Sequence, residues 1–245
     1  MLIFLLLGSL IVLLQLWIAH RHHVREKSPK HTPNPLYPYE NPSHILRSPK
    51  PPRLGGILTS IPLDTFEKEE KIRWINSPVA YNNTISFLAT KTQNTAENNK
   101  NIHCNFNDFV ICDIDKTVGK GVFVTKPVKF GTVIGIYTGI LNLSHGRADK
   151  KYSLFCTLDA EPYFYDANYY RNVTAYVQHA PSKTQPGIAK ANIITHVTVQ
   201  RGIPVTWFVA SRDIAIYEQL LFDYGEHYWK KDEVVKLFDL EGNVI

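Results

Sequence analysis

The residues that could carry chemistry lie in four short stretches in the second half of the chain. They are residues 119–123 (GKGVF), 131–139 (GTVIGIYTG), 166–179 (DANYYRNVTAYVQH) and 212–225 (RDIAIYEQLLFDYG). A glycine-rich turn lets the backbone come close to a ligand, and a tyrosine hydroxyl such as that of Tyr137 or Tyr224 can orient a reacting group. Each stretch taken singly is common, so the inference rests on their order and separation.

Two kinds of site are excluded by spacing. The glycines at residues 119–121 precede a strand-like run and have no third glycine, whereas a dinucleotide fingerprint needs the turn to open a helix. The three cysteines are Cys104, Cys112 and Cys156. Their odd number and spacing do not suit a zinc cage, and His179 has no partner cluster, so we predict no metal. Cys104 and Cys112 could form a disulfide or stay as separate thiols, and separate thiols favour a reducing compartment.

In this order and at these separations, the four stretches resemble the SET family. That family shows G-x-G before a hydrophobic strand, then G-x-x-I-x-x-Y-x-G. A D-A that leads to N-H follows, and the pattern ends in R-D-I-x-x-x-E-x-L-x-F-D-Y-G. The matching region runs from residue 119 to residue 225. The resemblance implies a mostly β SET fold with few helices, in which short curved sheets surround a C-terminal pseudoknot. It also implies transfer of a methyl group from S-adenosylmethionine to a protein lysine.

The resemblance assigns roles to individual residues. Tyr224 corresponds to the catalytic tyrosine, and Tyr137 to a tyrosine of the lysine channel. Phe222 matches a position where phenylalanine, in contrast to tyrosine, implies di- or trimethylation. Alternatively, Phe222 is only a core side chain, and Tyr137 and the loop before Asn192 set the product state. The residues expected to contact the cofactor are Lys120, Gly121, Phe123, Tyr152, Gln178, His179, Tyr224 and Trp229, with Gly119 beside them.

The chain departs from the family pattern in several places. Gln178 replaces the asparagine of the N-H pair, and a longer loop at residues 180–191 replaces the tight N-H-S-C-x-P-N stretch. A cysteine-rich zinc segment is missing after Gly225, as in bacterial-type members, so Tyr228, Trp229 and a C-terminal helix would have to close the site. These differences leave a second hypothesis open, a SET-fold binding module with weak or no turnover.

Short β-like runs rich in Val, Ile, Thr, Tyr and Phe must position these residues. We predict strands at residues 121–125, 132–137, 152–158, 163–166, 192–199 and 205–211. Only two helices are expected in this region, at residues 168–177 and 226–238. Many short strands with few helices argue against a parallel, doubly wound sheet.

The rest of the chain divides by composition. Residues 2–19 carry no formal charge and just reach the length of a membrane span, and basic residues follow. Residues 28–62 contain nine of the fifteen prolines, which predicts an extended arm without a helix or a central strand. The predicted units are an anchor helix at 1–20, a Pro-rich linker at 21–62 and an N-flanking segment at 63–103. The SET domain follows at 104–229, and a C-terminal helix or tail at 230–245.

Charge separates the arm from the domain. Residues 1–100 hold 12 Lys/Arg against 7 Asp/Glu, whereas residues 104–229 hold 12 against 11. The predicted domain therefore lacks the clustered basic residues of a nucleic-acid-binding protein, and no nucleic-acid partner is predicted. The expected partners are a protein lysine, on a histone or another protein, and a membrane held through residues 2–19.

The basic residues after the anchor place the domain on the cytoplasmic face. The uncharged run could instead be an export signal, and a composition typical of an AT-rich genome would suit a bacterial effector acting in a host cell. A third functional hypothesis is a membrane-tethered scaffold whose Pro-rich arm is the working part.

Overall fold

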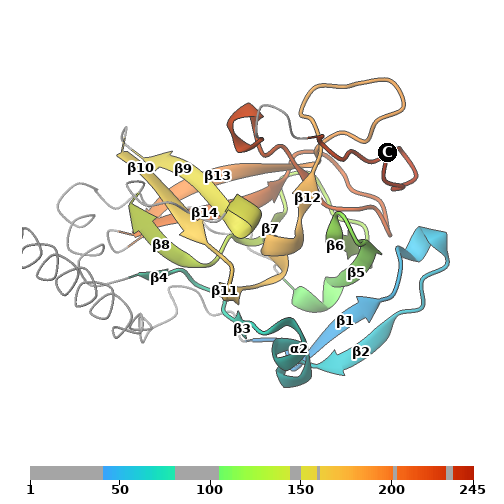
Figure 1. Cartoon of the computed structure of the whole chain (residues 1–245), viewed down its shortest axis with the longest axis horizontal. Coiled ribbons are helices and arrows are strands. Elements are labelled where there is room, and N and C mark those ends of the chain that lie inside the picture. Colours follow the sequence, from blue (N-terminus) through green and yellow to red (C-terminus); the bar gives the residue numbers. More distant parts are fainter. Residues whose placement is uncertain (1–40, 81–104, 144–149, 159–160, 201–202, 230–233) are drawn as a thin grey trace, which may run out of the picture.

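The structure is a computed structural model that describes residues 41–80, 105–143, 150–158, 161–200, 203–229 and 234–245 (Figure 1). Short strands make up most of its regular structure, and one α-helix lies among the described residues. The prediction of a mostly β chain with few helices is therefore confirmed. Across the described ranges, no helix combines the length and apolar character needed to cross a membrane. The anchor predicted at residues 2–19 lies outside these ranges and stays a prediction.

The first sheet joins the proline-rich region to the predicted domain. Its order is β2 (Thr59–Pro62), β1 (His44–Ser48), β5 (Phe109–Asp115) and β6 (Gly119–Val124). β1 runs antiparallel to β2 and parallel to β5, so it is a central strand. The prediction that prolines exclude a central strand here is wrong, because the prolines lie between and at the ends of the strands. For example, Pro52 begins the 3₁₀ helix η1 (Pro52–Leu54), and Pro62 directly precedes helix α2.

Helix α2 (Leu63–Glu70) and the two short strands after it lie against the main body (Figure 1). β3 (Arg73–Trp74) pairs in parallel with β11 (Tyr170–Arg171), which lies shortly before Gln178 and His179 in the chain. Phe66 of α2 is fully buried, and its ring centroid lies 6.2 Å from those of Trp74 and Tyr176. The residues before the matched region are thus packed into the same core.

Two further sheets complete the fold. One has the order β4 (Val79–Ala80), β8 (Ile140–Leu143), β10 (Glu161–Asp166) and β9 (Ser153–Leu158). The 3₁₀ helix η3 (Lys150–Tyr152) leads into β9. The other sheet contains five strands in the order β12 (Gln178–His179), β15 (Leu221–Phe222), β13 (Ile193–Gln200), β14 (Ile203–Ala210) and β7 (Val133–Ile136). Each of the six predicted strands corresponds to an observed strand, and the ends of the two differ by at most two residues.

Both predicted helices are wrong. Residues 168–177 form β11 and then a single 3₁₀ turn, η4 (Val173–Tyr176). Asn172 prevents a longer helix from starting earlier, because its buried side chain caps η4 through the N–H of Thr174 and donates to the carbonyl of Ile136. In the described parts of residues 226–238, which are 226–229 and 234–238, the 3₁₀ turn η5 (Glu226–Tyr228) is the only helical element, and Val234–Leu237 have no regular structure.

The C-terminal segment lies beside the second half of the long loop at residues 180–191 (Figure 1). The N–H of Ala189 donates to the carbonyl of Phe238 at 2.8 Å, and Ile188 forms an isolated β-bridge with Asp239. Phe238 is 1% exposed and packs against Ala180 and Leu221. Burial of this aromatic ring stabilises the contact between the C-terminal segment and the rest of the domain.

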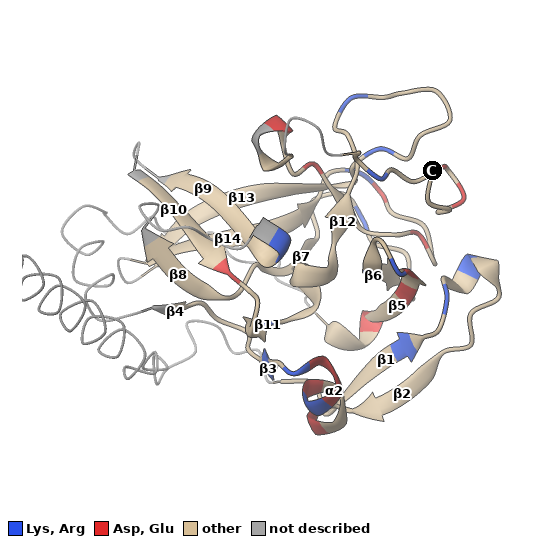
Figure 2. Cartoon of the chain, in the orientation of Figure 1, with Lys and Arg blue, Asp and Glu red and all other residues tan. Residues whose placement is uncertain are grey.

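Acidic residues gather on α2, where Lys68 lies among four Asp and Glu residues (Figure 2). An ion-pair cluster connects α2 to the first sheet. Lys120 of β6 contacts Asp113 of β5 and, at 3.4 Å, Glu70 of α2. This cluster ties the residue at the middle of the G-K-G turn to the N-flanking segment.

Candidate active site

The segment before Tyr224 is fixed by one buried side chain. Asn192 is fully buried, and its amide nitrogen donates to the carbonyl of Gln219 at 2.8 Å. Its amide oxygen accepts the N–H of Leu221 at 2.8 Å. β15 then lies between β12 and β13 and runs parallel to both. Because a fully paired buried amide strongly favours one arrangement, Asn192 sets the register of Phe222 and Tyr224.

Tyr224 is held at both ends. Its hydroxyl donates to the carbonyl of Val177 at 2.6 Å, and its backbone N–H donates to Nδ1 of His179 at 3.2 Å. Burial raises the pKa of the Tyr224 phenol, and the neighbouring Tyr228 and Tyr152 raise it further. The hydroxyl is therefore protonated at neutral pH and can act as a hydrogen-bond donor.

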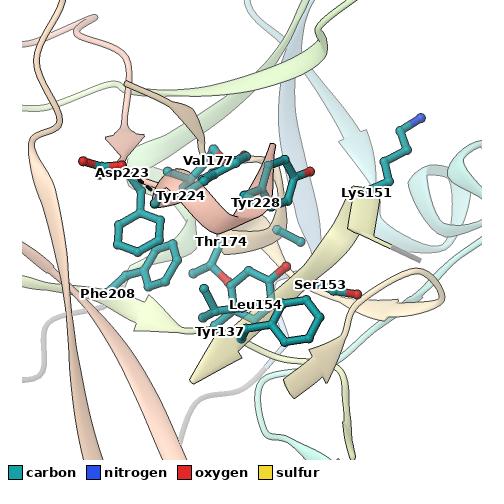
Figure 3. A pocket seen from close by; sticks show the side chains of 14 residues that line it. Tyr137, Lys151, Ser153, Leu154, Thr174, Val177, Phe208, Asp223, Tyr224 and Tyr228 are labelled. Carbon is teal, nitrogen blue, oxygen red and sulfur yellow. Dashed lines mark hydrogen bonds between the residues drawn. The ribbon is translucent and has the colours of Figure 1, made fainter. Parts of the chain in front are cut away.

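The larger cavity at this site has a volume of about 560 Å³, and six of its fourteen lining residues are aromatic (Figure 3). Tyr137, Phe208, Phe222 and Tyr224 follow one another along its wall. Successive ring centroids lie 5.6, 5.1 and 6.2 Å apart. All three residues predicted for the lysine channel, Tyr137, Phe222 and Tyr224, line this cavity.

Tyr137 follows β7 and is nearly completely buried. Its hydroxyl donates to the carbonyl of Tyr152 at 3.0 Å. Burial raises the pKa of Tyr137 well above its ordinary value, and the nearby Tyr224 and Tyr228 add to this effect. Tyr137 therefore presents a neutral ring, and its hydroxyl connects the wall of this cavity to Tyr152.

A second cavity, of about 390 Å³, lies on the other side of Tyr224. Six of the eight residues predicted to contact the cofactor line it, namely Lys120, Tyr152, Gln178, His179, Tyr224 and Trp229. The two cavities share Lys151, Ala175, Tyr224 and Tyr228. The side chain of Lys151 points away from the rings of the larger cavity (Figure 3). The aromatic side chains of Tyr224 and Tyr228 therefore form the boundary between the cavities.

Aromatic rings form one wall of the second cavity. The Trp229 ring is stacked on that of Tyr224, with 6.1 Å between the ring centroids. Its centroid lies 5.0 Å from that of His179 and 4.9 Å from that of Tyr228. Tyr152 lies under the guanidinium of Arg171, whose central carbon is 3.9 Å from the ring centroid. A cavity with several flat rings suits a ligand that carries a planar aromatic group.

Gln178 supports the G-K-G turn from behind. Its amide nitrogen donates to the carbonyl of Lys120 at 2.6 Å and lies 3.4 Å from that of Val118. Gly119, at the start of the turn, has a φ of 84°, which strongly favours glycine. The glutamine that departs from the family's asparagine thus fixes the backbone beside the second cavity.

Gly121 and Phe123, the other two predicted cofactor contacts, do not line the second cavity. A methyl group on Gly121 would lie 2.5 Å from Cδ1 of Ile114 and 2.9 Å from Nε2 of Gln219, so a larger residue would have to displace the ends of these two side chains. Phe123 is 2% exposed and packs against Val110 and Cys112. Side chains alternate along β6, and this alternation takes Gly121 and Phe123 to a face away from the second cavity.

Sequence reasoning missed several lining residues. Phe208 on β14 lies between Tyr137 and Phe222. Tyr176 on η4 lines the second cavity, and its buried hydroxyl has no hydrogen-bond partner in the described part of the chain. The predicted strand at residues 205–211 includes Phe208, but no sequence signal placed its side chain beside Tyr137.

Protonation of His179 is expected to destabilise the fold. The ring is buried, and its Nδ1 must be unprotonated to accept the N–H of Tyr224. Burial lowers the pKa of His179 below the ordinary 6.5, although Asp223 and the carbonyl of Phe222 partly oppose the shift. As the pH falls, the unfolded chain therefore takes up this proton first. Stability present above pH 6.5 is lost as the pH falls toward the folded-state pKa.

We therefore expect the free energy of unfolding of the wild type to fall, relative to that of His179→Asn, as the pH is lowered from neutral through the ordinary histidine pKa of 6.5. Urea unfolding at several pH values measures this difference. His196→Asn, at an exposed position on β13, is the matched control and should keep the wild-type slope. Parallel pH curves for the wild type and His179→Asn would contradict the assigned role.

The chain is similar in sequence to known proteins over the region that forms the site. Residues 119–225 match the model of the SET domain. The histone-lysine N-methyltransferase EHMT1 of Mus musculus is 32% identical over 127 residues, which are 49% of this chain and 9% of that protein. The Homo sapiens EHMT1 is 31% identical over 120 residues, again 9% of that protein. The chain thus spans about a tenth of the length of these curated relatives.

A solved structure supports the fold. The crystal structure of ATXR5 in complex with mono-methylated histone H3.1 has a TM-score of 0.52 and 16% sequence identity, and the match covers 67% of this chain and 86% of that chain. At this identity the likeness shows the fold alone. The predicted SET fold is confirmed, and SET methyltransferases use S-adenosylmethionine.

Proposed function

Because the chain carries a SET domain, at residues 119–225, we propose that it transfers a methyl group from S-adenosylmethionine to a lysine side chain of another protein. The observation that carries this proposal is the meeting of two cavities at Tyr224 and Tyr228. One cavity would hold the cofactor and the other the lysine. The reacting atoms would then meet at the boundary, where a positioned reaction gains much of its rate.

The residues of the second cavity fit the cofactor. Trp229 and Tyr152 offer flat surfaces for an adenine ring. Lys120, Gln178 and His179 would contact the ligand from the G-K-G turn and from β12. When bound, the cofactor supplies an activated methyl group on a sulfonium, so this chemistry needs no metal.

The larger cavity fits a lysine side chain. Its wall of Tyr137, Phe208, Phe222 and Tyr224 provides apolar contact for the methylene groups. Burial in such a wall disfavours the charged ammonium and lowers the pKa of a lysine. The channel would thereby favour the neutral amine, which has the lone pair that the reaction requires.

Within this proposal, Tyr224 orients the amine. Its hydroxyl already donates to the carbonyl of Val177, which fixes the position of the oxygen. That oxygen can accept one N–H of the amine and so direct the lone pair toward the cofactor cavity. Trp229, stacked on Tyr224, and the adjacent Tyr228 would limit the access of water to the boundary.

Binding of S-adenosylmethionine to the purified full-length protein separates this proposal from a scaffold function. Calorimetry should show saturable binding, and Trp229→Ala should weaken it because one ring of the cavity is removed. A protein that binds the cofactor but transfers no label to mixed candidate proteins would support the binding-module alternative. Absence of cofactor binding by folded protein would favour the scaffold.

The substrate protein is proposed at the level of its chemistry. The EHMT1 relatives are histone-lysine methyltransferases and ATXR5 was crystallised with histone H3.1, so histones are the first substrates to test. Transfer of labelled methyl groups to histones and to a mixture of other proteins, followed by site mapping, would identify the lysine.

We propose that the enzyme adds more than one methyl group. Phe222 lies 5.1 Å from Phe208 and 6.2 Å from Tyr224, ring to ring, in the wall of the lysine cavity. A phenylalanine here adds no hydroxyl that could hold a water molecule against an incoming methylated amine. Phe222→Tyr is therefore expected to shift the product toward monomethyl-lysine without greatly slowing the first transfer. Mass spectrometry of long reactions measures the distribution, and a wild-type product that stops at monomethyl-lysine would contradict this assignment.

We also propose that residues 2–19 anchor the protein with the SET domain on the cytoplasmic face. The uncharged run and the basic residues that follow it support this orientation. Carbonate extraction should leave the protein in the membrane, and protease added to intact vesicles of cytoplasmic-side-out orientation should digest the domain. Release into the soluble fraction, or protection of the domain, would contradict the proposal.

A further inference from the structure

Arg171 is a buried cation that lies behind the wall of the second cavity. The residue is 6% exposed, and its guanidinium donates a hydrogen bond to the carbonyl of Asn168. Within the described part of the chain, no ion pair balances its charge. A buried guanidinium is costly to desolvate, so the aromatic rings against which it packs are its main remaining partners.

The guanidinium stacks on the ring of Tyr152. Its central carbon lies 3.9 Å from the centroid of that ring and 5.4 Å from the centroid of Tyr176. The two tyrosine rings meet edge to face, with 6.3 Å between their centroids. Attraction between a guanidinium and a ring face grows when both are removed from water. Both tyrosines line the second cavity, whereas Arg171 does not, so Arg171 acts on this cavity through their rings.

The backbone of Tyr152 is fixed without the help of Arg171. Its carbonyl accepts the hydroxyl of Tyr137 at 3.0 Å and the N–H of Ala167 at 2.9 Å. These bonds do not determine the side-chain torsions, which place the ring relative to the cavity. The ammonium of Lys151 lies farther from the ring centroid, at 5.5 Å. The stacked guanidinium is therefore the contact best placed to hold the ring in one orientation.

The N-flanking segment positions Arg171 in turn. Strand β11, which carries Arg171, pairs with β3 of that segment. The N–H of Ile75 donates to the carbonyl of Arg171 at 3.1 Å, and the N–H of Arg73 donates to that of Tyr169 at 2.9 Å. β3 lies before the residues that match the SET domain, 119–225. A segment outside the family match thus fixes the backbone from which the guanidinium reaches the cavity wall.

We propose that Arg171 is a positioning residue for the cofactor, because its guanidinium holds Tyr152 in the orientation that receives S-adenosylmethionine. This inference rests on the proposed function. Without the stack, the ring samples other orientations, and the apparent affinity falls with the fraction of protein that is competent to bind. Arg171→Met should therefore raise the dissociation constant for S-adenosylmethionine about five- to tenfold.

The test is calorimetric titration of the full-length protein with S-adenosylmethionine, together with initial rates of methyl transfer. In Arg171→Met the KM for the cofactor should rise with the dissociation constant, while kcat at saturating cofactor stays within about twofold of the wild type. Arg73→Met is the matched control, because Arg73 is exposed on the paired strand β3. It should bind the cofactor like the wild type.

A double-mutant cycle separates positioning from a general loss of structure. In the Tyr152→Leu background, Arg171→Met should weaken binding by no more than about twofold, because the ring through which it acts is gone. A merely structural role would lower the affinity by the same factor in both backgrounds. Thermal unfolding checks that each variant folds.

Arg171→Lys takes the place of Arg171→Met if the latter does not fold. Lysine keeps the charge and can still donate to the carbonyl of Asn168, but it has no flat face to stack on the ring. It should raise the dissociation constant about threefold. Unchanged affinity in the folded variant, or an equal loss with and without the Tyr152 ring, would overturn the inference. A folded wild type that binds no S-adenosylmethionine would instead contradict the proposed function, and this inference with it.

Discussion

Replacing Tyr224 with phenylalanine is expected to lower the rate of methyl transfer by about 100- to 1,000-fold, the usual effect of removing one hydrogen-bonding group at a reacting centre. The ring would remain, and with it the contacts to Tyr228 and Trp229. Affinity for S-adenosylmethionine should therefore stay within about threefold of the wild type, since no ordinary hydrogen bond to the cofactor is removed. Initial rates and calorimetric titration measure the two quantities separately.

Tyr169→Phe is the matched control, because Tyr169 is half exposed and lines neither active-site cavity. This variant should transfer methyl groups at the wild-type rate. Tyr224→Phe also leaves the carbonyl of Val177 without its donor, so a modest loss of stability is expected and must be measured beside the rate. A folded Tyr224→Phe protein with the wild-type rate would remove Tyr224 from its assigned role.

The second large effect concerns the C-terminal segment. Phe238→Ala is expected to lower the free energy of unfolding by about 3–5 kcal/mol, as for other buried aromatic residues replaced by alanine. The side chain is 1% exposed and packs against Ala180 and Leu221, which border the active site in sequence. Urea unfolding monitored by tryptophan fluorescence measures the change.

Leu240→Ala provides the comparison, since Leu240 is 69% exposed on the same segment. Its replacement should change the free energy of unfolding by no more than about 0.5 kcal/mol. Equal effects of Phe238→Ala and Leu240→Ala would show that the C-terminal segment is not docked on the long loop in solution.

Residues in an ordered motif could be predicted well from the sequence. Tyr137, Phe222 and Tyr224 line one cavity, and six predicted cofactor contacts line another. These positions follow from short strands with fixed alternation, joined by motifs of fixed length. Alternation also explains the exceptions, because Gly121 and Phe123 face the side of β6 that packs on Ile114 and Cys112. Their placement required knowledge of which face of the strand is turned inward.

Errors arose where tertiary contacts override local preference. Residues 168–177 have apolar spacing typical of a helix, but Asn172 bonds to the carbonyl of Ile136, 36 residues away. The proline count in residues 28–62 concealed β1, whose Ile45 is buried beside β5. In both cases the deciding partner is distant in sequence, and local composition carries no record of it.

The central claim is that the two cavities joined at Tyr224 transfer a methyl group to lysine. The most direct measurement is incubation of the full-length protein with histones and methyl-labelled S-adenosylmethionine, followed by complete hydrolysis and chromatography of the amino acids. We expect the label in Nε-methylated lysine, at a level about 100- to 1,000-fold lower with Tyr224→Phe. Label in another amino acid, or equal labelling of lysine by the wild type and Tyr224→Phe, would contradict the account.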